Sequence, residues 1–332
     1  MAKQLFFDDN KLFGLDNTVR KQGKPELAAV YSDEACSTDY CTGYVFKLEN
    51  GKYRMLYMAH GQNFTEYRYC LNVDVNDDKL AELYGMYAFE YDGMYIGVPH
   101  LYRHLKSEFN TKYKNGIIDT QLAYSYDGRY WTRGIREPFI SGINPDADTQ
   151  YNLMWVSNMI KSADGNLYFY AAASEAEHGM AFEKPGTGKM HIYRLRNDGF
   201  VSLVSEDKDK TASVITREKV WHSGELHLNL KAKKATVGVY VTEESEMVES
   251  NLLGNATPLE GYGHEDCIEF SGDSTDWIPQ YKTGKKLDEL KGKTLVFELR
   301  FNDGEVFSLS DDYTDVFNVP AARYRKFGVL PE

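Results

Sequence analysis

The sequence is short of cysteine, and its cysteines form no metal-binding or redox pattern. Four cysteines occur in 332 residues, and no two of them make a Cys-x-x-Cys pair. This argues against a zinc ribbon and against a thioredoxin-type motif. Cys36 and Cys41 are close enough in sequence to bridge in an oxidising compartment, but with no leader in view we expect free thiols. We expect no metal and no other cofactor.

Clustered positive charge and long apolar runs are also missing. Lysine and arginine total 38 against 50 aspartates and glutamates, which gives a net charge of −12. A nucleic-acid or anionic-membrane surface needs clustered positive charge, so we expect neither partner. No run of about 18 apolar residues occurs, which excludes a transmembrane helix. The first residues lack the apolar segment of a signal peptide, so we expect a cytoplasmic protein; a periplasmic or secreted protein whose leader was removed is the alternative.

Several catalytic motifs are incomplete. The sequence Gly186-Thr-Gly-Lys189 lacks the earlier glycine and the following serine or threonine of a phosphate-binding loop. A Gly-x-Ser-x-Gly elbow is absent, so an esterase has no support. His100 and His104 have the spacing of two zinc ligands on a helix, but the glutamate of a His-Glu-x-x-His motif is missing and Pro99 precedes them. A zinc site is therefore not expected.

Aromatic residues, in contrast, are abundant. The chain has 25 tyrosines, 17 phenylalanines and 4 tryptophans, which together make up 14% of it. Tyrosine and phenylalanine favour strands, and tyrosine also lines polar pockets such as sugar-binding sites. Apolar runs recur along the chain, each closed by a turn signal, so we predict an all-β protein. Short helices are expected only near residues 79–83 and 286–290. In the first part of the chain we expect strands over residues 43–51, 52–59, 67–74, 86–93, 94–102, 119–128, 152–160, 166–173, 191–195 and 200–204.

The strands recur in units of about 45 to 60 residues, which is typical of the blades of a β-propeller. The best local marker is Ser125-Tyr-Asp127-Gly128-Arg-Tyr-Trp131. In such a turn Asp127 caps its own backbone, Gly128 takes a positive φ, and Trp131 fills the space between blades. A plain hairpin is the alternative interpretation. We predict a β-propeller over residues 1–205.

The pattern changes after residues 205–215, which are polar and are expected to form a linker or a long turn. Residues 225–230, 236–241 and 294–301 alternate with period two. Such alternation is typical of sheets with one buried face, so we predict a β-sandwich over residues 206–332.

Several separate phrases occur along the chain in a fixed order: Gly93-Met-Tyr-Ile-Gly-Val-Pro-His100, Asp119-Thr-Gln-Leu-Ala-Tyr-Ser-Tyr-Asp-Gly128, Arg136-Glu-Pro-Phe139, Asp198-Gly-Phe-Val-Ser-Leu203 and Phe297-Glu-Leu-Arg300. With them the chain resembles a large group of bacterial glycoside hydrolase family 32-like proteins, most of them uncharacterised. The resemblance covers about residues 5–310 and implies a five-bladed β-propeller followed by a β-sandwich. Five blades need more chain than residues 1–205 provide, so we expect unusually compact blades or an incomplete ring that a partner subunit closes, as in a homo-oligomer.

A propeller glycosidase uses carboxylates in a central funnel, one as acid and another as nucleophile or base. The clear family 32 catalytic phrases are absent; Glu265-Asp266-Cys267 resembles one of them but lies in the predicted sandwich. Judged by their positions near predicted inner strands, the catalytic candidates are Asp119, Glu137, Asp148 and Glu175. Three of them also have a plain structural interpretation: turn capping for the two aspartates and an ion pair with Arg136 for Glu137.

Four further residues are candidates for binding a sugar. Asp39 precedes the first predicted blade strand, and His100 follows the Gly-x-Pro strand. Arg103 could pair with the carboxylate of an acidic sugar, and Trp155 could stack on a sugar face or simply pack in the core. Two hypotheses follow for a chain with a carbohydrate ligand. It is either a glycoside hydrolase that acts on a poly- or oligosaccharide with two carboxylates, or a non-catalytic glycan-binding or assembly protein on a degenerate propeller.

Overall fold

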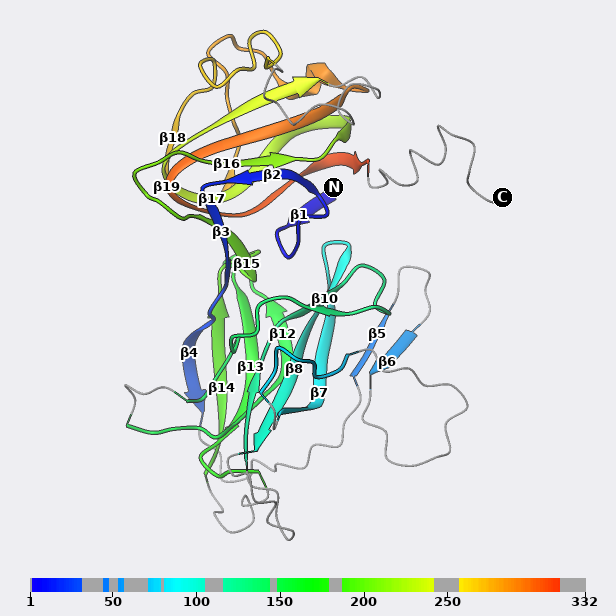
Figure 1. Ribbon diagram of the computed structural model, residues 1–332, viewed down its shortest axis with the longest axis vertical. Helices are drawn as coiled ribbons and strands as arrows, with labels where there is room; N and C mark the ends of the chain where they lie inside the picture. The colour runs from blue at the N-terminus through cyan, green and yellow to red at the C-terminus, as the bar shows by residue number, and fades with distance from the viewer. Residues whose placement is uncertain are drawn as a thin grey trace, which may run out of the picture. The chain divides into compact units, whose positions relative to one another are not determined.

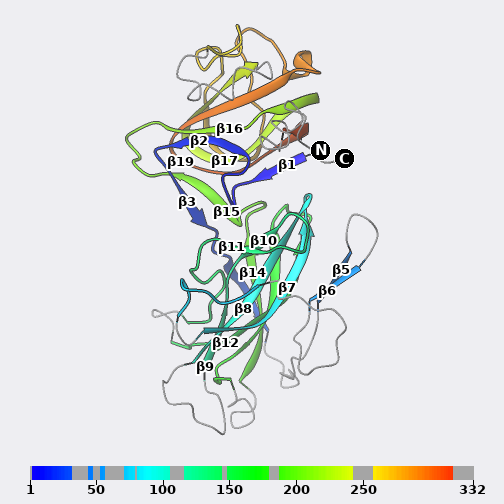
Figure 2. The same ribbon diagram turned by 45° about the vertical axis from the view of Figure 1, so that its right-hand side comes forward.

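The computed structural model describes residues 2–31, 44–47, 53–56, 71–78, 81–104, 116–143, 148–178, 187–241 and 257–316. The chain divides into two compact units (Figures 1 and 2). Unit 1 comprises Met1–Lys21 and Val201–Glu332, and unit 2 comprises Gln22–Phe200.

The chain is all-β, as predicted. The described residues form strands and one 3-10 helix, η1 (Leu287–Leu290), which lies where a short helix was expected. In unit 1 the strands are β1 (Ala2–Leu5), β2 (Leu12–Asp16), β3 (Thr18–Gln22), β15 (Val201–Ser205), β16 (Ala212–Thr216), β17 (Lys219–Val241), β18 (Phe270–Trp277) and β19 (Thr294–Asp315). In unit 2 they are β4 (Glu26–Tyr31), β5 (Tyr44–Lys47), β6 (Tyr53–Leu56), β7 (Ala81–Tyr91), β8 (Met94–His104), β9 (Gly116–Thr120), β10 (Ala123–Ser125), β11 (Thr132–Arg133), β12 (Leu153–Lys161), β13 (Leu167–Ser174) and β14 (Gly188–Leu195).

Unit 2 is built on one hydrogen-bonded sheet with two antiparallel groups of strands. In the first group, β8 lies between β7 on one side and β9 and β10 on the other, and β11 follows β10. In the second group, β12, β13 and β14 form a meander that β4 extends (Figure 1). The groups join where Leu153 of β12 pairs in parallel with Ile118 of β9. The β-propeller itself remains a prediction, as does a partner subunit that closes it.

Two turns of unit 2 have the geometry that their residues predict. Asp92 and Gly93 have φ values of 48° and 83°, as the tight hairpin between β7 and β8 requires. In the second turn the Asp127 Oδ1 accepts backbone hydrogen bonds from Arg129 at 2.7 Å and from Tyr130 at 2.9 Å. Gly128 has a φ of 64°, so it takes the predicted positive φ.

The ring of Trp131 is buried and packs against Met86, Ala88, Tyr95 and Ala123. A Cβ on Gly97 would come within 2.8 Å of this ring, so the glycine makes room for it. The tryptophan of the predicted turn therefore fills a core position.

In unit 1, strands from both ends of the chain share one sheet. β1 pairs with β19, β2 pairs with β16, and β3 lies beside β15. Met1–Lys21 thus belong to the same compact unit as Val201–Glu332, whereas the sequence predicted them to lie in the first domain. Of the two expectations for the polar segment 205–215, the long turn holds and the linker does not: residues 206–211 connect β15 to β16, and both strands pair with β19. A β-sandwich over residues 206–332 stays a prediction.

Some local predictions were wrong. Residues 81–83, expected in a short helix, open the strand β7, and residues 71–74, expected in a strand, have no regular structure. At residues 81–83 the long-range pairing of β7 with β8 decides the structure over local propensity. Among the described residues, no helix combines the length and the apolar character needed to cross a membrane.

Candidate functional site

The four predicted catalytic carboxylates do not meet in one place. Asp119 is buried on β9 and forms an ion pair with Arg103 of β8. Glu137 is exposed and lies 3.7 Å from the ammonium group of Lys24, rather than pairing with Arg136. Asp148 is also exposed. Glu175 is the one of the four that is half-buried, just after β13, and it makes no ion pair with the residues that the structure describes.

Asp119 is the most perturbed of the four. Burial raises the pKa of its carboxyl group, and the hydrogen bond from Arg103 opposes that rise. Its Oδ1 is buried and has no hydrogen-bond partner within the described part of the chain. A carboxylate held by an arginine is a poor general acid or nucleophile, so its geometry favours a structural role.

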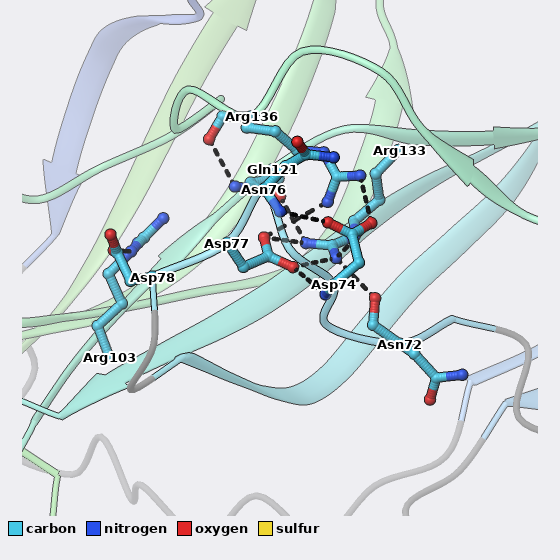
Figure 3. Close-up of polar contacts among 9 residues, drawn as sticks. All are labelled: Asn72, Asp74, Asn76, Asp77, Asp78, Arg103, Gln121, Arg133 and Arg136. Carbon is cyan, nitrogen blue, oxygen red and sulfur yellow. Dashed lines mark hydrogen bonds and ion pairs between the residues drawn. The ribbon is translucent and has the colours of Figure 1, made fainter.

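Asp119 and Arg103 belong to a larger set of charged residues, here called the aspartate–arginine network, which Figure 3 shows without Asp119. Arg103, Asp78 and Asp119 form one group of it. This group adjoins a second group, around Asp77 and Arg133, through the chain neighbours Asp77 and Asp78. Its centre is a pair between two side chains that are each only 1% exposed, Asp77 and Arg133. The Arg133 Nη1 donates to Asp77 Oδ1 at 2.7 Å and to Gln121 Oε1 at 3.0 Å. The other members of the network are Asp74, Asp78, Arg103, Asp119 and Arg136.

Ion pairs at the rim of the network hold the two remaining aspartates of the segment 71–78. Arg136 Nη2 donates to Asp74 at 2.7 Å, and Arg103 Nε donates to Asp78 at 3.0 Å. The backbone N–H of Asn76 and the guanidinium of Arg136 lower the pKa of Asp74. Burial raises the pKa of Asp77, but hydrogen bonds from Arg133 and the backbone outweigh it, so that this pKa is lowered overall. Both carboxyl groups are thus held ionised.

The structure brings together two of the predicted sugar-binding residues. The rings of His100 and Trp155 stack with centroids 4.6 Å apart and planes 8° from parallel. His100 is fully buried, and its Nε2 lies 3.1 Å from the backbone nitrogen and oxygen of Val156. Burial lowers its pKa to about 3. His100 therefore packs against one face of the Trp155 ring and, being fully buried, cannot itself contact a ligand. Asp39, the fourth candidate, lies outside the described residues.

Trp155 also belongs to a group of ring-bearing side chains, here called the histidine–tyrosine cluster: Tyr84, Tyr102, His104, Trp155 and His178. Tyr84 lies edge-on to Trp155 and to His178, with both centroid distances at 5.1 Å. The Tyr84 hydroxyl and the His178 Nε2 are 2.9 Å apart. The centroid of the Tyr102 ring lies 4.8 Å from that of His178 and 4.4 Å from that of His104. Tyr102 and Trp155 are buried, whereas Tyr84 and His178 are half-buried and form the accessible part.

Strand register positions this cluster. Tyr102 and His104 are two residues apart on β8 and so project from one face of the sheet, whereas Arg103 projects from the other. The backbone N–H of His178 donates to the Gly116 carbonyl at 2.9 Å, and this bond fixes the turn after β13 beside the start of β9.

Carboxylates lie at the edge of the cluster. Burial raises the pKa of Tyr102 to about 12, and the nearby Glu82, Tyr84 and Glu177 contribute in the same direction. Asn152 donates to the Glu175 backbone carbonyl at 2.6 Å, which ties the same turn to β12. Aromatic faces next to carboxylates are a combination suited to the rings and hydroxyl groups of a sugar.

Sequence reasoning missed several of these residues. Asp74 was placed at the end of a strand, and Asp77, Tyr84 and His178 fell outside every motif. The dense acidic run from Asp74 to Asp78 was a usable signal, because such a run seldom lies on a strand. Nothing in the sequence pairs Tyr84 with His178, since 94 residues separate them.

Comparisons with known proteins add little. No protein-family model matches the sequence, and no curated protein matches it. Among solved structures the chain is similar to xylan β-1,4-xylosidase from Bacillus halodurans C-125, with 10% sequence identity and a TM-score of 0.30. The match covers 84% of this chain and 77% of the xylosidase chain. At this level of similarity neither the fold nor the activity of the xylosidase carries over, so the site is interpreted from its own geometry.

Proposed function

We propose that this chain binds a carbohydrate through the histidine–tyrosine cluster and does not hydrolyse it. The observation that carries the proposal is the assembly of Tyr84 from β7, Trp155 from β12 and His178 from the turn after β13, beside Glu177. Tyr84 offers an aromatic face and His178 a polar atom, while the buried Trp155 and His100 keep the platform rigid. A preformed aromatic surface with a few convergent polar groups is the usual form of a small-ligand site.

The dispersal of the acids supports binding over hydrolysis. A glycosidase needs two carboxyl groups about 5 to 10 Å apart, in environments that keep one protonated and the other ionised. Asp119 is tied to Arg103, whereas Glu137 and Asp148 are exposed. Hydrolysis remains the second candidate because Glu175 and Glu177 lie in one turn beside the cluster.

The proposed fold is a shortened β-propeller of the glycosidase type followed by a β-sandwich. The two antiparallel strand groups of unit 2 have the size of propeller blades, and β4 completes the second group from the N-terminal side. Innermost strands of neighbouring blades lie side by side, which suits the parallel contact of β9 with β12.

Calorimetric titration with a panel of oligosaccharides, together with an assay for released reducing ends, tests the proposal. We expect Tyr84→Ala to lower the affinity about tenfold, because it removes an aromatic contact worth about 1 kcal/mol or more. Tyr130→Ala is the matched control, since Tyr130 is 70% exposed and lies outside the cluster. An unchanged affinity in Tyr84→Ala would contradict the site. Release of reducing ends by the wild type that Glu175→Gln or Glu177→Gln abolishes would establish the hydrolase instead.

A further inference from the structure

The segment of residues 71–78, here called the acidic strap, is held to the sheet of unit 2 mainly by charge. It has no strand or helix, and its side chains Val73 and Val75 are 42% and 98% exposed. Leu71 alone of its apolar residues packs on a core group, the one around Trp131. The remaining contacts with the sheet come from Asp74, Asp77 and Asp78, and from the Asn72 carbonyl, which accepts a hydrogen bond from Arg133 at 2.6 Å.

The arginines that receive the strap belong to the sheet and its connections, not to the strap. Arg103 lies on β8, Arg133 on β11, and Arg136 just beyond β11. Gln121 braces two of them: its Oε1 accepts from Arg133, and its Nε2 donates to the Arg136 carbonyl at 2.5 Å. Gln121 thus holds the Arg133 side chain and the Arg136 backbone without the strap, whereas the Arg136 guanidinium group donates to Asp74 and Asp77 of the strap (Figure 3).

The charges show what the strap does electrostatically. The sheet contributes three arginines and one aspartate, Asp119, to the network, and the strap contributes three aspartates. Without the strap the network would carry a net charge of +2 in a chain whose overall charge is −12. Arginine forks bind carboxylates in a bidentate manner, as Arg133 binds Asp77 here.

We propose that the acidic strap occupies the binding site of a ligand that carries several carboxylate groups. Such a ligand displaces Asp78 from Arg103 and Asp74 from Arg136. That the ligand is a saccharide, hence one with uronate sugars, rests on the proposed function. The carboxylate preference rests on the arginines alone. This second site lies on the opposite face of β8 from the histidine–tyrosine cluster, because Arg103 alternates with Tyr102 and His104.

The test removes the exposed half of the strap's charge. Asp74 and Asp78 are 44% and 70% exposed, so Asp74→Asn/Asp78→Asn weakens the strap while the buried pair of Asp77 and Arg133 stays in place. We expect this variant to bind a trimer of galacturonic acid about tenfold more tightly than the wild type. Adding Arg136→Gln should cancel the gain, and raising the salt concentration to about 1 M should abolish it.

Controls separate the outcomes. Glu90→Gln/Asp209→Asn removes two charges elsewhere and should leave galacturonate binding unchanged. Equal galacturonate affinity in the strap variant and the wild type overturns the proposal, while binding of neutral xylotriose by both would leave the proposed function standing. A strap variant that binds neither sugar but binds a peptide with the sequence of residues 71–78 would also overturn the saccharide assignment. Should the double variant fail to fold, Asp78→Asn alone gives the same comparison.

Discussion

The stacked pair of His100 and Trp155 makes a quantitative prediction about pH and stability. Burial lowers the pKa of His100 from 6.5 to about 3. The folded protein therefore keeps this imidazole neutral at pH values where the unfolded chain already binds a proton. The resulting stabilisation is complete above about pH 6.5 and is lost progressively as the pH falls toward 3.

The magnitude follows from the shift. One pKa unit corresponds to about 1.4 kcal/mol, so the folding free energy linked to His100 falls by about 3 kcal/mol between pH 7.5 and 4.5. The ceiling over the whole shift is about 5 kcal/mol. His191 contributes in the same direction, because burial lowers its pKa to about 4.

The perturbation is His100→Phe, which keeps a ring on Trp155 but cannot titrate. At pH 7.5 it should cost about 1 kcal/mol, since the hydrogen bond to Val156 is lost. At pH 4.5 the variant should be as stable as the wild type or more stable.

The assay is amide hydrogen exchange of peptides from β8 and β12, measured at both pH values and corrected for the intrinsic exchange rate. His222→Phe, at an exposed position of unit 1, is the matched control and should keep the wild-type pH dependence. The reasoning is refuted if His100→Phe and the wild type lose protection equally as the pH falls.

Three further predictions concern single positions. Glu298→Gln should destabilise unit 1 by about 3 kcal/mol in urea unfolding, because the buried carboxylate accepts from Tyr240, His264 and Arg300; a loss below about 0.5 kcal/mol would count against this. Gly97→Ala should lower thermal stability by about 1–3 kcal/mol, because its Cβ would lie 2.5 Å from a methionine sulfur and 2.8 Å from an indole carbon; an unchanged melting temperature would mean that these side chains yield freely. With the other three cysteines replaced by serine, the buried Cys267 should react with a thiol reagent only as fast as unit 1 opens, and rapid labelling in native buffer would contradict its burial.

Local patterns predicted the strands well where turn chemistry marks their ends. Asp92-Gly93 and Asp127-Gly128 fix φ by residue type, so the hairpin of β7 with β8 and the turn before β11 could be predicted from the sequence. The pairing of β1 with β19 could not, because it joins residues about 300 positions apart and leaves no local signal.

The candidate site was only partly predictable for the same reason. Arg103, Asp119, His100 and Trp155 were singled out from the sequence as polar or aromatic residues near predicted strands. Their partners decide what they do: an ion pair neutralises Asp119, and complete burial removes His100 from any ligand. Such partners are set by the register of neighbouring strands, which the sequence of one strand does not encode.

The most direct test of the central claim is a hydrogen-exchange footprint of the full chain with and without a bound oligosaccharide. Carbohydrate binding at the histidine–tyrosine cluster predicts added protection in peptides that contain Tyr84, Trp155 and residues 175–178. Protection confined to unit 1, or to the exposed turn that carries Tyr130, would contradict it.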